Sequence, residues 1–424
     1  MSRLGFHYYP DDQHYTQREL ERWLPILHDL GAGWLVLVGS PLRSVPEPFV
    51  TGLLEAGVEP IVHVPVPVGA VTPADLDPLL HGYARWGVRY VAVFDRPNVR
   101  GGWAQDSDWG RPGLIDRFLD RVLPIWEAER AAGLKPVFPA LEPGGDYWDT
   151  AFLEAALRGM VKRGADALLS EMALAIFGWT YGHPLDWGSG GPEKWPEARP
   201  YRTPQGCQDQ RGLRLYEWHR AAAVRAGAPS MPMIVLAGGA LPGEGESDPS
   251  GEVHAERNLS IARLLTQGEI PGYVQNFAFF LLAASAGHAL AHAAWFPANG
   301  SPRPVVGAFQ RLATSLDRPM AAKSPRPIRH YLLLDPASSP WAMLSDFVSA
   351  FRPTVGFSVE EARWADQVSI VGDGFPAEVE DRLKQAGCQV QRLSLSSLAR
   401  RPAPKATSPR PNNIAAMLSG VIHG

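Results

Sequence analysis

The sequence predicts an α/β fold, namely a (β/α)8 barrel over residues 1–318 followed by a small C-terminal α/β domain. Strand and helix patterns alternate eight times before about residue 317. The strand candidates are short and almost continuously apolar, which is typical of parallel strands buried on both faces. A chain of 424 residues with 45% hydrophobic content has room for a barrel of about 250 residues and a second domain.

In the first half of the barrel, apolar runs predict four strands, at 4–10, 34–39, 61–65 and 89–93. Helices are expected between them at 16–30, 46–56 and 72–86. Thr16 followed by Glu19 has the capping-box spacing, and Thr72 before Pro73 is a typical helix start. These signals predict where the helices 16–30 and 72–86 begin.

The second half continues the alternation. Strands are predicted at 137–141, 167–170, 232–239 and 288–296, and helices at 117–132, 151–163, 213–226, 254–267, 272–286 and 305–316. The polar and aromatic segment 177–210 is too long for a simple connection, so we expect it to form a wall over one end of the barrel. Residues 277–296 are apolar but include His288 and His292, which favours barrel core over a membrane span.

Beyond the barrel, residues 319–328 are rich in Pro, Lys, Ser and Arg and are expected to be a linker. Strands at 331–334, 368–371 and 390–393, with helices at 341–351 and 377–386, predict a doubly wound α/β domain over 329–400. Residues 401–424 are expected to be a flexible tail.

Composition narrows the function classes. A formal net charge of -4 gives no general reason to expect nucleic acid as a partner. The two cysteines, Cys207 and Cys388, lie far apart, which argues against a disulfide framework or a thiolate metal site. The N-terminus enters a strand without a signal-like leader, so a cytoplasmic protein is expected unless another export route operates. Fourteen Trp and eleven Tyr suit sugar stacking, although aromatic rings also pack cores.

Residues 94–103, directly after the strand at 89–93, resemble the fourth-strand segment of the clan A glycoside hydrolases. Pro97, Asn98 and Trp103 match that segment. Asp95 stands where the family has Asn, and Arg96 stands where it has the catalytic acid/base Glu. An arginine does not release its proton near neutral pH, so Arg96 cannot perform that role.

The resemblance covers about residues 3–317. Residues 142–149 are similar to the family's loop after strand five, and residues 164–166 are similar to its lead into strand six. At the end of strand six the family usually has a sugar-contacting His, whereas this sequence has Glu171. The nucleophile Glu of the family aligns with Ala237. The resemblance also implies that Trp295 forms an aromatic floor for the substrate.

Three functions remain open. The first is a catalytically impaired pseudo-glycosidase that binds a glycan. The expected substrate-binding residues follow barrel strands or lie in the loop 177–210, and they are Asp95, Arg96, Asn98, Trp103, Asp146, Trp179, Tyr181 and Trp295. The second is an active glycosidase that uses Glu142 and Glu171, since glycoside hydrolysis needs two carboxyl groups. The third is a structural or assembly protein on a glycosidase scaffold.

Arg96 raises the question of which anion it meets. A compensating carboxylate from Glu142 or Glu171 is one answer, because an unpaired buried charge is costly. An acidic or cell-wall glycan that reaches Arg96 and Arg100 is the other. A metal site formed by His7, His63, Glu142, Glu171 and His183 is a further alternative. No ligand spacing marks such a set, so neither a metal nor another cofactor is expected.

Overall fold

The computed structural model describes residues 2–228, 231–243, 251–298, 301–317, 328–335, 344, 347–348, 353–372 and 374–393. Its contacts divide the chain into two compact units, Met1–Asp317 and Arg318–Gly424. The predicted linker, except for Ile328, and the predicted tail lie outside the described residues.

The first unit is a barrel of eight parallel strands, in the order β4-β3-β2-β1-β8-β7-β6-β5. The strands are β1 Leu4–His7, β2 Trp34–Val38, β3 Glu59–Val64, β4 Tyr90–Val93, β5 Val137–Phe138, β6 Ala173–Trp179, β7 Met233–Gly239 and β8 Val274–Phe279. The two ends of this order meet through a bridge between Tyr90 and Lys135, which closes the barrel. The predicted (β/α)8 fold is therefore confirmed.

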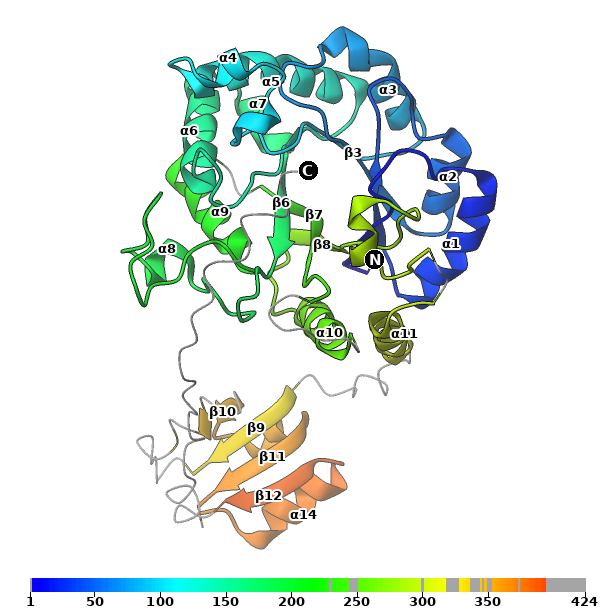
Figure 1. The fold of residues 1–424 in the computed structure, drawn as a ribbon. Helices are drawn as coiled ribbons and strands as arrows, with labels where there is room; N and C mark the ends of the chain where they lie inside the picture. The colour runs from blue at the N-terminus through cyan, green and yellow to red at the C-terminus, as the bar shows by residue number, and fades with distance from the viewer. Residues whose placement is uncertain are drawn as a thin grey trace. The chain divides into compact units, whose positions relative to one another are not determined.

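Helices surround the strands (Figure 1). The main ones are α1 Gln17–Asp29, α2 Glu47–Glu55, α3 Pro73–Arg85, α5 Leu114–Ala132, α6 Asp149–Lys162, α9 Leu215–Arg225, α10 Glu252–Thr266 and α11 Pro304–Asp317. The predicted start of α1 is confirmed, because Thr16 Oγ1 accepts from the Glu19 N–H and Glu19 Oε2 accepts from the Thr16 N–H. At α3, the Asp75 carboxylate accepts from the Thr72 N–H in the same way.

The barrel has two apolar layers. Residues on the inner faces of the strands form one buried cluster, which includes Trp34, Val36, Ile61, Tyr90, Ala92, Ile234 and Leu236. Residues on the outer faces join the surrounding helices in a larger cluster, which includes Phe6, Leu35, Val62 and Val91. Alternate residues of one strand thus belong to different layers, so both faces of the sheet are buried and each strand is almost entirely apolar.

Two of the predicted strands are wrong. Residues 167–170 belong to helix α7, Asp166–Glu171, and the sixth strand follows it as β6. The eighth strand is β8, which occupies part of the predicted helix 272–286, whereas residues 288–296 contain a short 3-10 helix, η2 Ala289–Ala293. Short apolar runs fit either a strand or a buried helix, and pairing with neighbouring strands decides between them.

For β8, the decisive pairing is with β7. The buried side chain of Asn276 donates to Val235 O at 3.0 Å and accepts from Val235 N at 3.1 Å. Because polar residues such as Asn276 interrupt the apolar run, the sequence pattern did not predict this strand. In the part of the chain that the structure describes, every helix is too short or too polar to span a bilayer.

The second unit contains a parallel four-stranded sheet in the order β10-β9-β11-β12. Its elements are β9 Ile328–Leu334, β10 Thr354–Gly356, α13 Val359–Ala362, β11 Ala365–Val371, α14 Ala377–Gln385 and β12 Gln389–Leu393. The three predicted strands and the helix at 377–386 are present. Most of the predicted helix at 341–351 lies outside the described residues.

Candidate functional site

The candidate site, called the mouth here, is the end of the barrel where the strands have their C-termini. The chain leaves β4 through Phe94, Asp95 and Arg96, and Phe94 and Arg96 have φ values of 78° and 43°. Non-glycine residues seldom adopt this left-handed region. The Arg96 N–H donates to Ala140 O at 3.1 Å, which ties the turn to the segment after β5.

Arg96 lies between two carboxylates. Its Nε donates to Asp95 Oδ2 at 2.8 Å, and its Nη1 lies 3.8 Å from Glu142 Oε2. The three side chains are partly exposed, at 20% for Asp95, 42% for Arg96 and 33% for Glu142. Glu142 is thus one of the two carboxylates that the sequence suggested for compensating Arg96, and Asp95 is the closer partner.

The surroundings shift the pKa values of this cluster. Burial raises the pKa of Glu142, and the nearby charges of Asp95 and Asp149 raise it further, against the lowering effect of Arg96. For Arg96, burial lowers the pKa, but Asp95, Glu142 and Tyr181 together more than offset it, and the net shift is upward. Arg96 therefore stays charged, whereas Glu142 holds a proton more readily than an ordinary glutamate.

Two histidines lie beside this cluster. Burial and the neighbouring His63 lower the pKa of His7 to about 3, and burial also lowers the pKa of His63. His63 Nε2 lies 3.3 Å from Phe94 O. Both rings are therefore neutral near pH 7, so they add hydrogen-bonding groups to the mouth without adding charge.

Aromatic side chains complete the mouth. The ring of Phe280, just after β8, lies 5.2 Å from the ring of His7 and 5.3 Å from that of Trp179, at the end of β6. Tyr181 also adds to the upward shift in the pKa of Arg96, which places its side chain in the electrostatic environment of the ion cluster. The mouth therefore combines flat apolar rings with polar and charged groups.

Asn98, Trp103 and Asp146 hold the loops of the mouth together. Asn98 Nδ2 donates to Glu142 O at 2.8 Å and Tyr147 O at 2.9 Å, and its Oδ1 accepts from Glu142 N at 2.8 Å. Trp103 Nε1 donates to Pro97 O, and Asp146 accepts from the Arg100 N–H. Asn98 is 0% exposed, so it braces the site and cannot touch a substrate directly, contrary to the expectation from the sequence.

Glu171 does not lie at the mouth. It is the last residue of α7 and precedes β6, so it lies on the side where that strand starts, whereas Glu142 follows the end of β5. It is exposed, and its charge is one of those that raise the pKa of Arg130. The predicted position of Glu171 after the sixth strand is wrong, and the structure does not bring Glu142 and Glu171 together.

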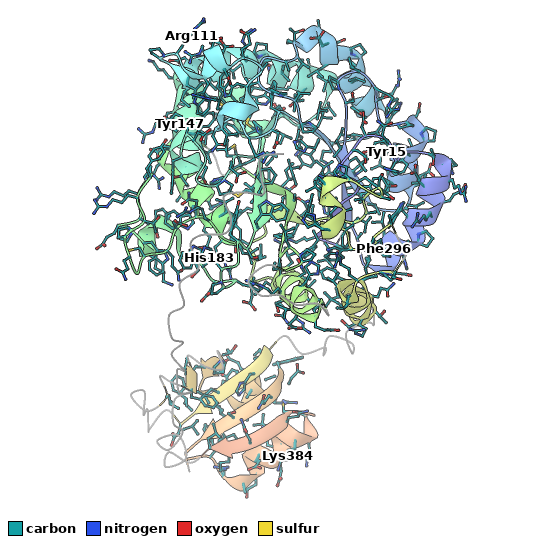
Figure 2. All side chains as sticks on the ribbon, viewed as in Figure 1. Tyr15, Arg111, Tyr147, His183, Phe296 and Lys384 are labelled. Carbon is teal, nitrogen blue, oxygen red and sulfur yellow. The ribbon has the colours of Figure 1, made fainter. Side chains whose placement is uncertain are left out.

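Trp295 is also misplaced by the sequence prediction, because the eighth strand ends sixteen residues before it, at Phe279. Its side chain is 0% exposed and packs against Phe6, Phe279 and Phe309 with ring centroids 4.8–5.7 Å apart. Figure 2 shows the next residue, Phe296, on the side of α1 and α11, and its ring lies 5.3 Å from that of Trp23. Trp295 is core and not a substrate floor.

Ala237 lies within β7 and is buried. Its methyl group has no acidic or nucleophilic function. Among the residues that the structure describes, no group of three or more His, Cys, Asp or Glu side chains is placed to hold a metal ion. His183, one of the five residues of the metal site suggested by the sequence, stacks on Trp187 with ring centroids 4.0 Å apart.

A buried polar network behind the mouth was not predicted. Asp149 and His219 are both 0% exposed, with His219 Nε2 at 2.9 Å from Asp149 Oδ2. Asp149 Oδ1 accepts from Gly144 N at 3.0 Å and Gln210 Nε2 at 2.7 Å. The network therefore fixes the loop that carries Glu142. No local signal reveals it, because its members come from α6, α9 and two loops.

No protein-family model matches the chain, and no curated protein matches it. One similar solved structure is that of a monomeric β-xylosidase from Caulobacter crescentus CB15. It is 14% identical in sequence, the match covers 73% of this chain and 67% of that chain, and the TM-score is 0.46. A family 39 glycoside hydrolase from the gut symbiont Bacteroides cellulosilyticus WH2 has 11% identity, 74% and 64% coverage, and a TM-score of 0.49.

An endoxylanase retrieved from a sugarcane soil metagenome has 11% identity, 74% and 96% coverage, and a TM-score of 0.44. All three of these similar structures are glycoside hydrolases. This chain spans 64% of the length of the Bacteroides enzyme. With identities this low, these likenesses transfer neither a residue role nor a substrate to this chain.

Proposed function

We propose that the mouth binds a carbohydrate and that the chain does not cleave it by the usual pair of carboxyl groups. The observation that carries this proposal is the ion cluster of Asp95, Arg96 and Glu142 directly after β4 and β5. A retaining glycosidase needs two carboxyl groups about 5–5.5 Å apart, one protonated and one ionised. Here the guanidinium of Arg96 lies between Asp95 and Glu142 and is paired with Asp95 at 2.8 Å, and an arginine cannot take the part of either carboxyl group.

Aromatic and polar groups support sugar binding. Trp179, Tyr181 and Phe280 offer ring faces, and the ion cluster and the two histidines offer hydrogen-bonding groups for hydroxyls. An apolar surface with a few convergent polar groups is typical of small-ligand sites. We infer that the ligand is a glycan, with its ring faces against the aromatic side chains.

The charge balance favours a neutral sugar over an acidic one. Arg96 already faces two carboxylates, so an anionic sugar would have to displace Asp95 or Glu142 from it. The acidic or cell-wall glycan suggested by the sequence would then depend on Arg100, whose side chain is exposed. Neutral oligosaccharides avoid this competition and are the first ligands to test.

A second candidate function is an active hydrolase. The raised pKa of Glu142 is a property of catalytic acids, and Asp95 offers a second carboxylate on the same arginine. The pair of Glu142 and Glu171 has lost its support, because Glu142 follows the end of β5 whereas Glu171 precedes the start of β6. The third function, a structural or assembly protein, predicts that the mouth takes no glycan.

Binding to an array of neutral, acidic and cell-wall oligosaccharides, followed by mass spectrometry of each bound glycan, tests these functions. We expect intact neutral glycans to be retained, with at least about tenfold weaker binding by Trp179→Ala. Trp364→Ala is the matched control, because Trp364 lies in the second unit and is 61% exposed. Cleaved glycans that disappear with Glu142→Gln would establish the hydrolase, and no retention would favour the structural function.

A further inference from the structure

A second cavity, called the flank cleft here, lies between α6, α9 and the loop that follows β6. It has a volume of about 520 Å³, which is within the usual range of about 300–1,000 Å³ for small-molecule sites. It is lined mainly by Trp148, Ala151, Glu154, Arg158, Arg199 and Trp218. Helices α6, α8 (Gly191–Lys194) and α9 lie together on one side of the barrel (Figure 1).

The flank cleft is distinct from the mouth. Asp95, Arg96, Glu142, Trp179 and Tyr181 do not line it. Its lining comes from Trp148, which directly precedes α6, from the outer helices α6 and α9 and from residues 192–210, whereas the mouth is built at the ends of the strands. A ligand of the flank cleft therefore needs no contact with the proposed glycan site.

The floor of the flank cleft is held in place by hydrogen bonds. Trp218 Nε1 donates to Gly188 O at 2.8 Å, and Gln210 Nε2 donates to Asp149 Oδ1 at 2.7 Å. Asp209 accepts from Thr203 Oγ1 at 2.7 Å. Trp218, Gln210 and Asp209 are all buried. A floor fixed in this way lowers the cost of ordering side chains when a ligand binds.

The charges of the flank cleft favour an anion. Glu154 is paired through one oxygen with Arg158 at 2.7 Å and through the other with Arg225 at 2.9 Å. The other acidic lining residue, Asp209, accepts from Arg211 Nε at 3.0 Å. Both lining carboxylates therefore already have arginine partners, so positive charge is in excess at this surface.

Arg199 adds to this excess. Among the residues that the structure describes, its guanidinium has neither an ion-pair nor a hydrogen-bond partner. Guanidinium groups bind carboxylate and phosphoryl oxygens through paired hydrogen bonds. Beside Arg199, the wall of the cleft is small and apolar, with Ala151, Ala155, Pro192, Ala198 and Pro200. The surface thus has an anion-binding group next to an apolar wall.

We propose that the flank cleft binds a small organic anion, with its carboxylate or phosphoryl group at Arg199 and its apolar body against the alanine and proline wall. This site is additional to the glycan site and does not depend on it. Arg158 and Arg225 keep Glu154 neutralised and strengthen the positive potential toward the ligand.

The test uses the full chain and four probes: phenyl phosphate, benzoate, inorganic phosphate and neutral benzyl alcohol. Calorimetry measures affinity, and the indole N–H signals of Trp148 and Trp218, assigned with Trp→Phe variants, report where each probe binds. We expect phenyl phosphate or benzoate to shift both signals and bind more tightly than benzyl alcohol. Whichever of phenyl phosphate and benzoate binds more tightly shows whether the site prefers a phosphoryl or a carboxylate group. Inorganic phosphate measures the affinity of the anionic group without the apolar ring.

Arg199→Gln and Arg202→Gln form a matched pair. The two arginines are exposed and pair with each other through their backbones, but only Arg199 lines the cleft. We expect Arg199→Gln to weaken binding of the preferred anion about tenfold, with little change for Arg202→Gln. Equal effects of the two variants, equal binding of benzyl alcohol, or no indole shift at about 10 mM of any probe would overturn the proposal.

Discussion

The buried pair of Asp149 and His219 offers the most direct test of how the mouth is supported. Replacing Asp149 with Ala removes the acceptor of three hydrogen bonds, from Gly144 N, Gln210 Nε2 and His219 Nε2, at 2.7–3.0 Å. Asp149 and His219 have no exposed surface, so water cannot replace the lost acceptor without rearrangement.

The magnitude follows from these contacts. A buried donor left without a partner costs about 1–3 kcal/mol, and Asp149 is the acceptor of three such donors. Because the three donors share one carboxylate, their costs do not simply add. We therefore expect Asp149→Ala to lower the free energy of unfolding of the barrel by about 3–5 kcal/mol. Asp149→Asn keeps one carbonyl oxygen and should lose less.

Urea unfolding followed by tryptophan fluorescence measures this change, since most of the tryptophans lie in the barrel. Asp146→Ala is the matched control in the same loop, because Asp146 is exposed and accepts one bond, from Arg100 N at 2.9 Å. The control should lose about 1 kcal/mol or less. If Asp149→Ala and Asp146→Ala lose similar amounts, the buried network does not brace the loop as the contacts indicate.

Three further predictions concern the mouth. Arg96 lowers the pKa of Glu142, so Arg96→Gln should raise that pKa further in a carbon NMR titration, and an unchanged pKa would refute their coupling. Burial lowers the pKa of His7 to about 3, so below about pH 6.5 the unfolded chain binds more protons than the folded chain. The free energy of unfolding therefore falls as the pH drops from about 6.5 toward 3, by up to about 1.4 kcal/mol per pH unit. His7→Gln should flatten that slope in unfolding measurements across this range, and an unaltered slope would assign it to other groups. Asn98→Ala removes three hydrogen bonds between loops and should cost about 2–4 kcal/mol by urea unfolding, whereas a loss below about 1 kcal/mol would show that the loops hold without it.

Local signals in the sequence were sufficient for most of the fold. The alternation of apolar strands with capped helices predicted the barrel, and the capping pattern at Thr16 placed the start of α1. These features depend on residues a few positions apart, so they can be recognised without knowing the fold. The misplaced sixth and eighth strands had no such signal. Pairing across the sheet selected β8, where Asn276 bonds to Val235, 41 residues away.

The candidate site shows the same division. From the sequence, Arg96 required an anionic partner, because a charge that is even partly buried is costly to leave unpaired. Only the tertiary structure selected Asp95 and Glu142 as its partners, placed Glu171 at the opposite side of the barrel, and joined Asp149 to His219, 70 residues away. The residue types in the sequence indicate which interactions are needed. Closure of the barrel determines which distant side chains come close enough to form them.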